Sequence, residues 1–394
     1  MIPRYNRLTI RLGRIIPVVH ILLIFLYLIM YIAQVYNMSF FRKDIRMYIM
    51  ILLVVFIFVR FVLRIRRKQK RNRVVFAIWL YLLVSFFLMV LHGSITKANL
   101  INELFVPIVF LSSYYAFEYI TIEKEAFKCI RLEFFVLLCF FLLFIYATYK
   151  LARTYGLYIN SSYYSALMLP FALLQKNRKT KLIGVVLVII PSILVAKRGA
   201  FLALAVSAYV YYVIKNDYFS NKKNSTGKKI WRIAALIIII GLIYYALVLL
   251  DSNIIARMRS IIDDGGSGRT EILRIIFQKI KNNSITEHLI GHGAYTSSTI
   301  VGLSAHNDFV EIYWSYGILG FCAYILVFYQ LCYVALRMKK DNFFRAAYIS
   351  SIVLFFVCSM VTQLMFVPSY VACLCMFWGF VLASKDLIIY ERGE

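Results

Sequence analysis

The sequence predicts an all-α, polytopic integral membrane protein with about 12 transmembrane helices and one long folded external loop containing an amphipathic helix. Two observations support this fold class. Of the 394 residues, 62% are hydrophobic and only 16% are charged, which leaves too little polar surface for a soluble domain of this size. The apolar residues also fall into runs close to the roughly 20 residues that cross a bilayer as a helix.

These runs are too long and too uniformly apolar for the alternating strands of a barrel, so helices are expected. Together they form a single membrane domain, residues 1–394. In chain order, the expected spans are 15–36, 47–63, 74–92, 104–121, 132–149, 157–175, 182–196, 200–214, 233–250, 309–334, 346–365 and 367–385.

Basic residues predict the orientation, because loops rich in Lys and Arg stay on the cytoplasmic side. With twelve spans, the basic segments 64–73, 176–181, 215–232 and 337–345 lie on the same side as both termini. We therefore expect a multi-pass protein of the cytoplasmic membrane, with cytoplasmic termini and an external loop at 251–308. The same topology, with contact to anionic lipid, accounts for the net charge of +27, so no nucleic-acid partner is expected.

The external loop 251–308 is expected to be folded, because it contains an apolar-periodic segment. Residues 269–281 are predicted to form an amphipathic helix, preceded by a flexible Gly265–Gly268 turn in which Ser267 is a possible cap. A second turn is expected at Gly291–Gly293. The apolar positions of the helix recur at three- and four-residue spacing: Leu273, Ile276, Phe277 and Ile280.

Arginines near these turns are candidates for binding a diphosphate, because the guanidinium fork matches phosphate oxygens and stays charged. Arg198, in an expected external turn, is out of place for a cytoplasmic anchor, and its neighbour Lys197 is a further candidate for contacting the substrate. Arg257, Arg269 and Arg274 lie in the external loop. The competing interpretation is that these arginines contact lipid headgroups. This interpretation is weakest for Arg269, because Arg269 directly follows the glycine-rich turn.

His306 is the candidate general base, since the pKa of an unperturbed imidazole is about 6.5. Asn307 or Asp308 could orient it, and both are candidates for contacting the substrate. Taken alone, such a His-Asn pair is more often an ordinary loop cap.

A metal site is the alternative use of the loop histidines His288, His292 and His306, with acidic residues as further ligands. Their spacing matches no metal-binding motif, so no metal and no cofactor is expected. The seven cysteines all lie outside 251–308, so neither a disulfide framework nor a thiolate metal site is supported there.

Five short motifs occur in a fixed order over residues 180–330, and each is weak by itself. In order they are Lys197-Arg198-Gly199-Ala200, Ser267-Gly268-Arg269, Gly291-His292-Gly293, His306-Asn307-Asp308 and Gly317-Ile318-Leu319-Gly320. As an ordered set on this topology, they resemble the O-antigen polymerase and O-antigen ligase superfamily of bacterial polysaccharide assembly. Outside 180–330 the resemblance is only topological.

The resemblance implies a metal-independent, inverting glycosyltransferase that uses a glycan on undecaprenyl diphosphate at the outer face of the cytoplasmic membrane. Arg198, Arg269 and His306 correspond to the family's catalytic Arg, Arg and His. Its partners would be the undecaprenyl-diphosphate-linked oligosaccharide and the lipid bilayer. A chain-length regulator and a flippase are the protein partners that such an enzyme could have. A polymerase, which transfers the chain onto another lipid-linked repeat unit, is favoured over a ligase, which transfers it to lipid A core or protein.

Two rivals remain. A polysaccharide flippase handles the same lipid, but a transporter is expected to have inverted repeats and short external loops. A peptidoglycan polymerase of the shape, elongation and division class uses a related donor, but its sequence signatures are not recognised here.

Overall fold

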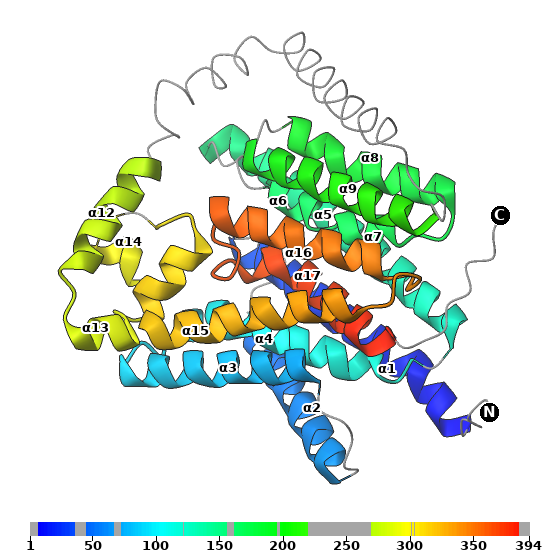
Figure 1. Cartoon of the computed structure of the whole chain (residues 1–394), viewed down its shortest axis with the longest axis horizontal. Coiled ribbons are helices and arrows are strands. Elements are labelled where there is room, and N and C mark those ends of the chain that lie inside the picture. The colour runs from blue at the N-terminus through cyan, green and yellow to red at the C-terminus, as the bar shows by residue number, and fades with distance from the viewer. Residues whose placement is uncertain are drawn as a thin grey trace.

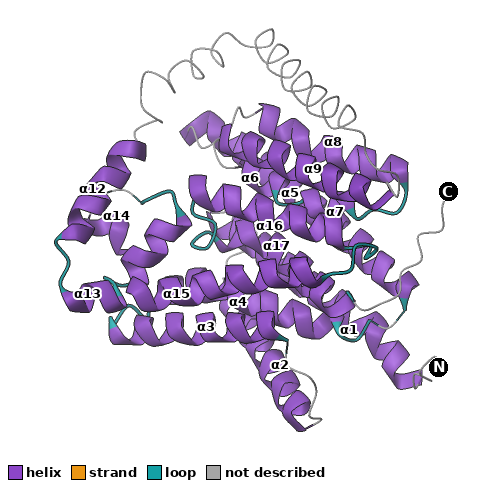
Figure 2. Ribbon diagram, in the orientation of Figure 1, coloured by secondary structure: helices purple, strands orange, loops and turns teal. Residues whose placement is uncertain are grey.

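The protein is all-helical throughout the residues that the computed structural model describes, which are 7–35, 45–66, 72–120, 122–155, 161–194, 198–219, 269–300, 302 and 304–385 (Figure 2). The first group of helices is α1 (Arg7–Val35), α2 (Arg46–Arg66), α3 (Arg73–Leu91), α4 (Lys97–Phe117), α5 (Glu123–Tyr155), α6 (Ser161–Ala166), α7 (Leu169–Leu173), α8 (Arg178–Leu194) and α9 (Arg198–Phe219). The second group is α12 (Arg269–Lys281), α13 (Ile285–Ile290), α14 (Thr296–Ile300), α15 (Asp308–Arg337), α16 (Arg345–Val361) and α17 (Pro368–Ser384).

Six of these helices are long and apolar enough to cross a membrane. They contain the segments Leu12–Gln34, Arg46–Arg64, Arg73–Leu91, Lys97–Phe117, Glu123–Ala147 and Asp308–Arg337. Shorter apolar helical segments cover Gly199–Lys215, Arg345–Val361 and Tyr370–Ser384. The predicted span 233–250 lies outside the described residues.

The expected single span 157–175 is wrong in detail, because two short helices, α6 and α7, replace it. The chain breaks at Leu167 and Met168, just before Pro170. Proline has no N–H to donate, and its ring collides with the carbonyl four residues earlier, so Pro170 lies in the first turn of α7 and does not continue α6.

Helix α17 forms the centre of the bundle and is buried along nearly its whole length, as Val371 and Phe380 illustrate. It packs most extensively on α4 (Figure 1). A Cβ added at Gly379 would lie 2.5 Å from the Cβ of Ser113, so glycine is what lets the two helices approach this closely.

One end of the bundle gathers acidic and basic helix ends, and we call it the Glu118 end. Arg60 and Arg64 of α2 both pair with Glu118, which caps the end of α4. Nε of Arg14 in α1 lies 3.3 Å from Oε1 of Glu125 at the start of α5. The start of α1, the end of α2, the end of α4 and the start of α5 therefore meet at this end.

The opposite end, which we call the His306 end, contains α12, α13 and α14 beside the start of α15 (Figure 1). The end of α3 meets it through His92, whose Nε2 lies 3.0 Å from the carbonyl oxygen of Ile290. The end of α16 meets it through Met360, whose carbonyl accepts a hydrogen bond from Asn307 Nδ2 at 3.3 Å. Segments far apart in the sequence therefore converge around the 304–308 turn.

The predicted amphipathic helix is confirmed as α12, with the bounds Arg269–Lys281. Ile276 is fully buried against Ala305 and Trp314, with Leu273 and Ile280 beside it. The expected apolar face is too wide by one residue, because Phe277 is 50% exposed.

Candidate functional site

His306 occupies a backbone conformation that side chains other than glycine rarely adopt. Its φ is +49°, in the left-handed region, and Tyr295 is the other non-glycine residue with positive φ in the described part of the chain. Such a conformation costs about 1–3 kcal/mol and persists only where the surroundings hold it. The side chain of His306 is half-buried.

Asn307 holds the chain immediately after His306. Its Oδ1 accepts hydrogen bonds from the backbone N–H groups of Phe309 and Val310, at 3.0 and 3.2 Å, and so caps the start of α15. Its Nδ2 donates to the carbonyl of Met360 at the end of α16. Both ends of the amide are therefore engaged in holding the protein together, which matches the cap alternative of the sequence analysis.

Asp308, the first residue of α15, is fully buried. Its Oδ1 accepts a hydrogen bond from the backbone N–H of Met365 at 3.1 Å. The carboxyl group thereby ties the start of α15 to the connection between α16 and α17. This contact secures the turn and leaves the side chain without solvent access.

Glu311 is a buried acidic residue that the sequence analysis missed. Its Oε2 accepts a hydrogen bond from the backbone N–H of Ala305 at 2.9 Å, and its Oε1 accepts one from the hydroxyl of Ser297 in α14. The sequence did offer a signal, because Glu311 is an acidic residue inside an otherwise apolar span. Placing such a residue in a membrane is costly, so its presence indicates a functional role.

The Gly291-His292-Gly293 motif and Gly317 form one packing joint. Gly317 breaks the helical geometry of α15, with φ +59° and ψ −159°. At this kink the N–H groups of His292 and Gly293 donate to the carbonyls of Trp314 and Ser315, each at 2.9 Å. A Cβ at Gly291 would lie 2.5 Å from the backbone of Ser315, and one at Gly317 would lie 2.5 Å from the backbone of Leu289. Both glycines are therefore required by close backbone contact.

The loop histidines other than His306 make structural contacts. The ring of His292 stacks on buried Trp314, with centroids 4.2 Å apart, and its Nε2 lies 3.1 Å from Asn283 Oδ1. His288 Nδ1 lies 2.7 Å from the hydroxyl of Tyr313. Burial lowers the pKa of His292 from its ordinary value, although nearby Glu287 acts in the opposite direction.

Burial raises the pKa of Tyr295 well above its usual value, and the carboxyl group of Glu103 on α4 adds to the rise. The Tyr295 hydroxyl donates to the carbonyl of Phe366, at 2.9 Å. This contact brings the connection between α16 and α17 against the loop that follows α13.

Arg198 and Arg269 are each the first residue of a helix, α9 and α12 respectively, and their side chains lie outside the described residues. A Cβ at Gly199 would lie 2.8 Å from Val361 Cγ2, so the start of α9 packs against the end of α16, beside the Met360 carbonyl that binds Asn307. The expected Lys197–Gly199 turn is thus displaced, since Arg198 and Gly199 already belong to α9.

Arg274 lies on the exposed face of α12, where its guanidinium forms two hydrogen bonds, of 2.9 and 2.6 Å, with Glu271. This pair raises the pKa of Arg274 and lowers that of Glu271. Lys197 and Arg257, also predicted to bind substrate, lie outside the described residues.

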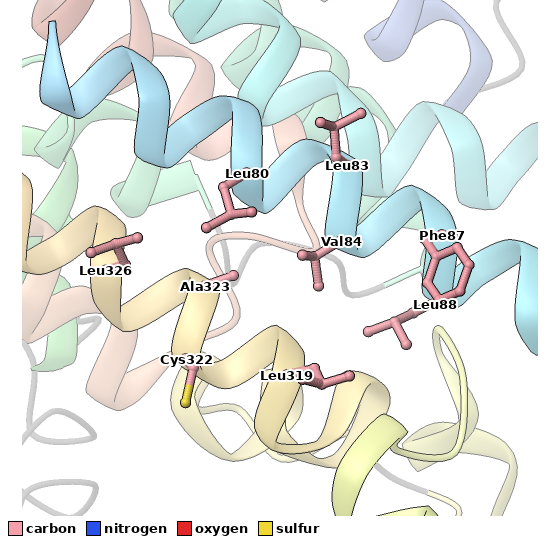
Figure 3. Close-up of a pocket in the computed structure, with 9 residues that line it drawn as sticks. All are labelled: Leu80, Leu83, Val84, Phe87, Leu88, Leu319, Cys322, Ala323 and Leu326. Atoms are coloured by element: carbon pink, nitrogen blue, oxygen red, sulfur yellow. The ribbon is translucent and has the colours of Figure 1, made fainter.

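An open apolar groove of about 540 Å³ runs between α3 and α15 (Figure 3). It begins at Leu319, just beyond the Gly317 kink, and none of its lining residues belongs to the predicted site. The lining residues are Leu80, Leu83, Val84, Phe87, Leu88, Leu319, Cys322, Ala323 and Leu326.

Within the described ranges, no three His, Cys, Asp or Glu side chains lie close enough together to hold a metal ion. No family model matches this chain, and no curated protein matches it.

Proposed function

We propose that this chain is a membrane-embedded polysaccharide polymerase. It transfers a glycan chain from undecaprenyl diphosphate onto a lipid-linked repeat unit during O-antigen, capsule or exopolysaccharide assembly. The proposal is supported by the ordered motifs over 180–330, and by the convergence of the start of α9, the buried face of α12 and the 304–308 turn at one end of an apolar bundle.

The single observation that carries the proposal is the strained turn at His306. A histidine with φ +49°, fixed by hydrogen bonds on both sides, costs stability that an ordinary loop would not retain. Left-handed residues of this kind cluster at active sites, and histidine is the side chain best suited to exchange protons near neutral pH.

In the proposed reaction, a hydroxyl oxygen of the acceptor sugar attacks the anomeric carbon of the donor. His306 takes the hydroxyl proton, and the bond from that carbon to the diphosphate breaks with inversion. Arg198 and Arg269 neutralise the charge that develops on the departing diphosphate, so neither a general acid nor a metal is needed. Asn307 and Asp308 act by fixing the turn, as their contacts favour.

The apolar groove between α3 and α15 has the lining that an isoprenoid tail requires, and it starts next to the α13–α15 joint at the His306 end. We place the chain in the cytoplasmic membrane with both termini in the cytoplasm and the His306 end outside. Its partners would be the lipid-linked oligosaccharide and the bilayer, together with a chain-length regulator and a flippase.

The glycan ladder of a strain lacking this gene tests the proposal. Wild-type protein is expected to restore long chains, while Arg198→Ala, Arg269→Ala and His306→Ala, at equal abundance, leave a single repeat unit attached to its acceptor.

Three other outcomes would contradict a polymerase. Full-length chains that accumulate unattached on undecaprenyl diphosphate would indicate a ligase. Repeat units that accumulate on the cytoplasmic face would indicate a flippase. A glycan ladder that the deletion leaves unchanged would exclude a role for this chain in making that glycan.

A further inference from the structure

Glu311 is, with Asp308, one of two buried acidic residues at the start of α15, and its burial needs a reason. It lies one turn into α15 and is 1% exposed, within a helix that is otherwise long and apolar. A carboxylate at such a position is costly, and its retention points to a task beyond packing. Since it has almost no exposed surface, that task does not include contact with the substrate.

The two oxygens of Glu311 hold two separate segments. Oε2 accepts the N–H of Ala305, the residue directly before His306, at 2.9 Å. Oε1 accepts the hydroxyl of Ser297, which is also fully buried, in α14. One turn further along α15, Trp314 Nε1 donates to Thr296 Oγ1 at 3.1 Å, so α14 is attached to α15 at two successive turns.

His306 is therefore fixed from both directions. Asn307 holds the chain after it by capping α15, and Glu311 holds the chain before it through Ala305. Because Ala305 is itself buried against Ile276 of α12, the same short segment also joins the helix that begins at Arg269. A shift of Ala305 would displace the His306 ring and alter its distance from anything bound beside α12.

We propose that Glu311, supported by Ser297, is the positioning residue that sets the placement of His306. The inference rests on the proposed function, in which His306 accepts the proton of the acceptor hydroxyl. Glu311 acts through the backbone of Ala305, and it needs an oxygen acceptor at that point and not a negative charge. Glutamine would meet this need, because its carbonyl can accept from Ala305 while its NH₂ group donates to the Ser297 oxygen.

The test measures the rate of chain elongation by purified protein supplied with lipid-linked repeat units. Glu311→Ala is expected to lower kcat by about 100-fold with a smaller change in KM, since a misplacement of about 1 Å can have such an effect. Glu311→Gln is expected to stay within about threefold of wild type. Combined with His306→Ala, the Glu311→Ala change is expected to cause no further loss, because it acts through a ring that is already absent.

The matched control is Glu287→Ala on α13, which removes the carboxylate of an exposed capping box and is expected to leave kcat unchanged. If Glu311→Ala fails to accumulate, Ser297→Ala keeps the carboxylate and is expected to lower kcat about tenfold. The proposal is overturned if Glu311→Ala, or in its place Ser297→Ala, elongates at the wild-type rate. Two further results would overturn it. One is that Glu311→Ala lowers kcat as much in the His306→Ala protein as it does in the wild type. The other is that Glu311→Gln folds but is as inactive as Glu311→Ala. Failure of the proposed function is distinguishable, because the wild type would then not elongate the glycan, or His306→Ala would elongate it as fast as the wild type.

Discussion

His306 carries a conformational cost that the neighbouring residues offset. Its left-handed backbone is held between the Glu311 contact to Ala305 and the Asn307 cap of α15. Strain of this kind is common where a side chain has to be presented in one orientation. The stability of this turn and its chemistry can therefore be separated by substitution.

Replacing His306 by glycine or by alanine separates the stability of the turn from its chemistry. Both changes remove the same ring, but glycine adopts positive φ without strain, so His306→Gly is expected to be about 1 kcal/mol more stable than His306→Ala. Thermal unfolding in detergent measures the difference. Both variants should lack elongation activity; an active glycine variant would mean that the ring does not take part in the reaction.

His292 predicts a pH dependence of stability at the same end. Burial lowers its pKa in the folded protein below the ordinary value of 6.5, with contributions from His92, His288 and Lys279, while Glu287 opposes the shift. The stability that neutral His292 contributes is present above about pH 6.5 and is lost as the pH falls through the lower folded pKa.

The substitution His292→Phe keeps an aromatic ring against Trp314 but cannot be protonated. Its melting temperature is expected to fall less between pH 7 and pH 5 than that of the wild type. Melting curves across that range check this, and an identical fall in the two proteins would exclude His292 as the cause.

At the scale of elements, the joint between α13 and α15 depends on backbone contact at Gly291 and Gly317. Gly317→Ala would combine positive φ with a Cβ 2.5 Å from the backbone of Leu289. Gly302 is the matched control, since its φ is +82° but nothing lies within 4 Å of an added Cβ.

Gly302→Ala is expected to cost about 1 kcal/mol from strain alone, and Gly317→Ala about 3 kcal/mol or more, because the kink has to shift. Thermal unfolding of the two purified variants compares these effects. Equal losses would show that close packing contributes nothing to the joint.

Helix α12 and the six helices long enough to cross a membrane could be predicted because their information is local. The three- and four-residue spacing of Leu273, Ile276 and Ile280 defines both the helix and its buried face. Phe277 was misplaced because spacing does not specify how wide the covering surface is. The break before Pro170 was locally visible but was outweighed by the apolar character of 157–175.

At the scale of the whole molecule, the site depends on contacts that no local pattern encodes. The sequence predicted His306, Asn307 and Asp308 as one group, but not that Asn307 would bind Met360 or that Asp308 would bind Met365, more than fifty residues away. Glu311 was missed for the same reason, since its role depends on its hydrogen bonds with Ala305 and Ser297. Gly291 and Gly317 looked like motif residues, and their packing reason appears only when α13 meets α15.

The proposed orientation in the cell can be tested with one exposed residue on each proposed side of the membrane. Gly302 at the His306 end and Lys340, between α15 and α16, are both exposed. Gly302→Cys is expected to react with a membrane-impermeant maleimide on intact cells, and Lys340→Cys only after permeabilisation. The wild type, with seven native cysteines, gives the background, and the reverse labelling pattern would invert the proposed topology.

The central claim is that the His306 end joins lipid-linked sugars, and reconstitution tests it most directly. Purified wild-type protein in lipid vesicles would receive the undecaprenyl-diphosphate-linked repeat units that accumulate in the deletion strain. The account predicts longer glycans on undecaprenyl diphosphate, one undecaprenyl diphosphate released per bond formed, and an inverted anomeric configuration, with no elongation by folded His306→Gly. Repeat units left unchanged by folded wild-type protein, or elongated equally by His306→Gly, would contradict it.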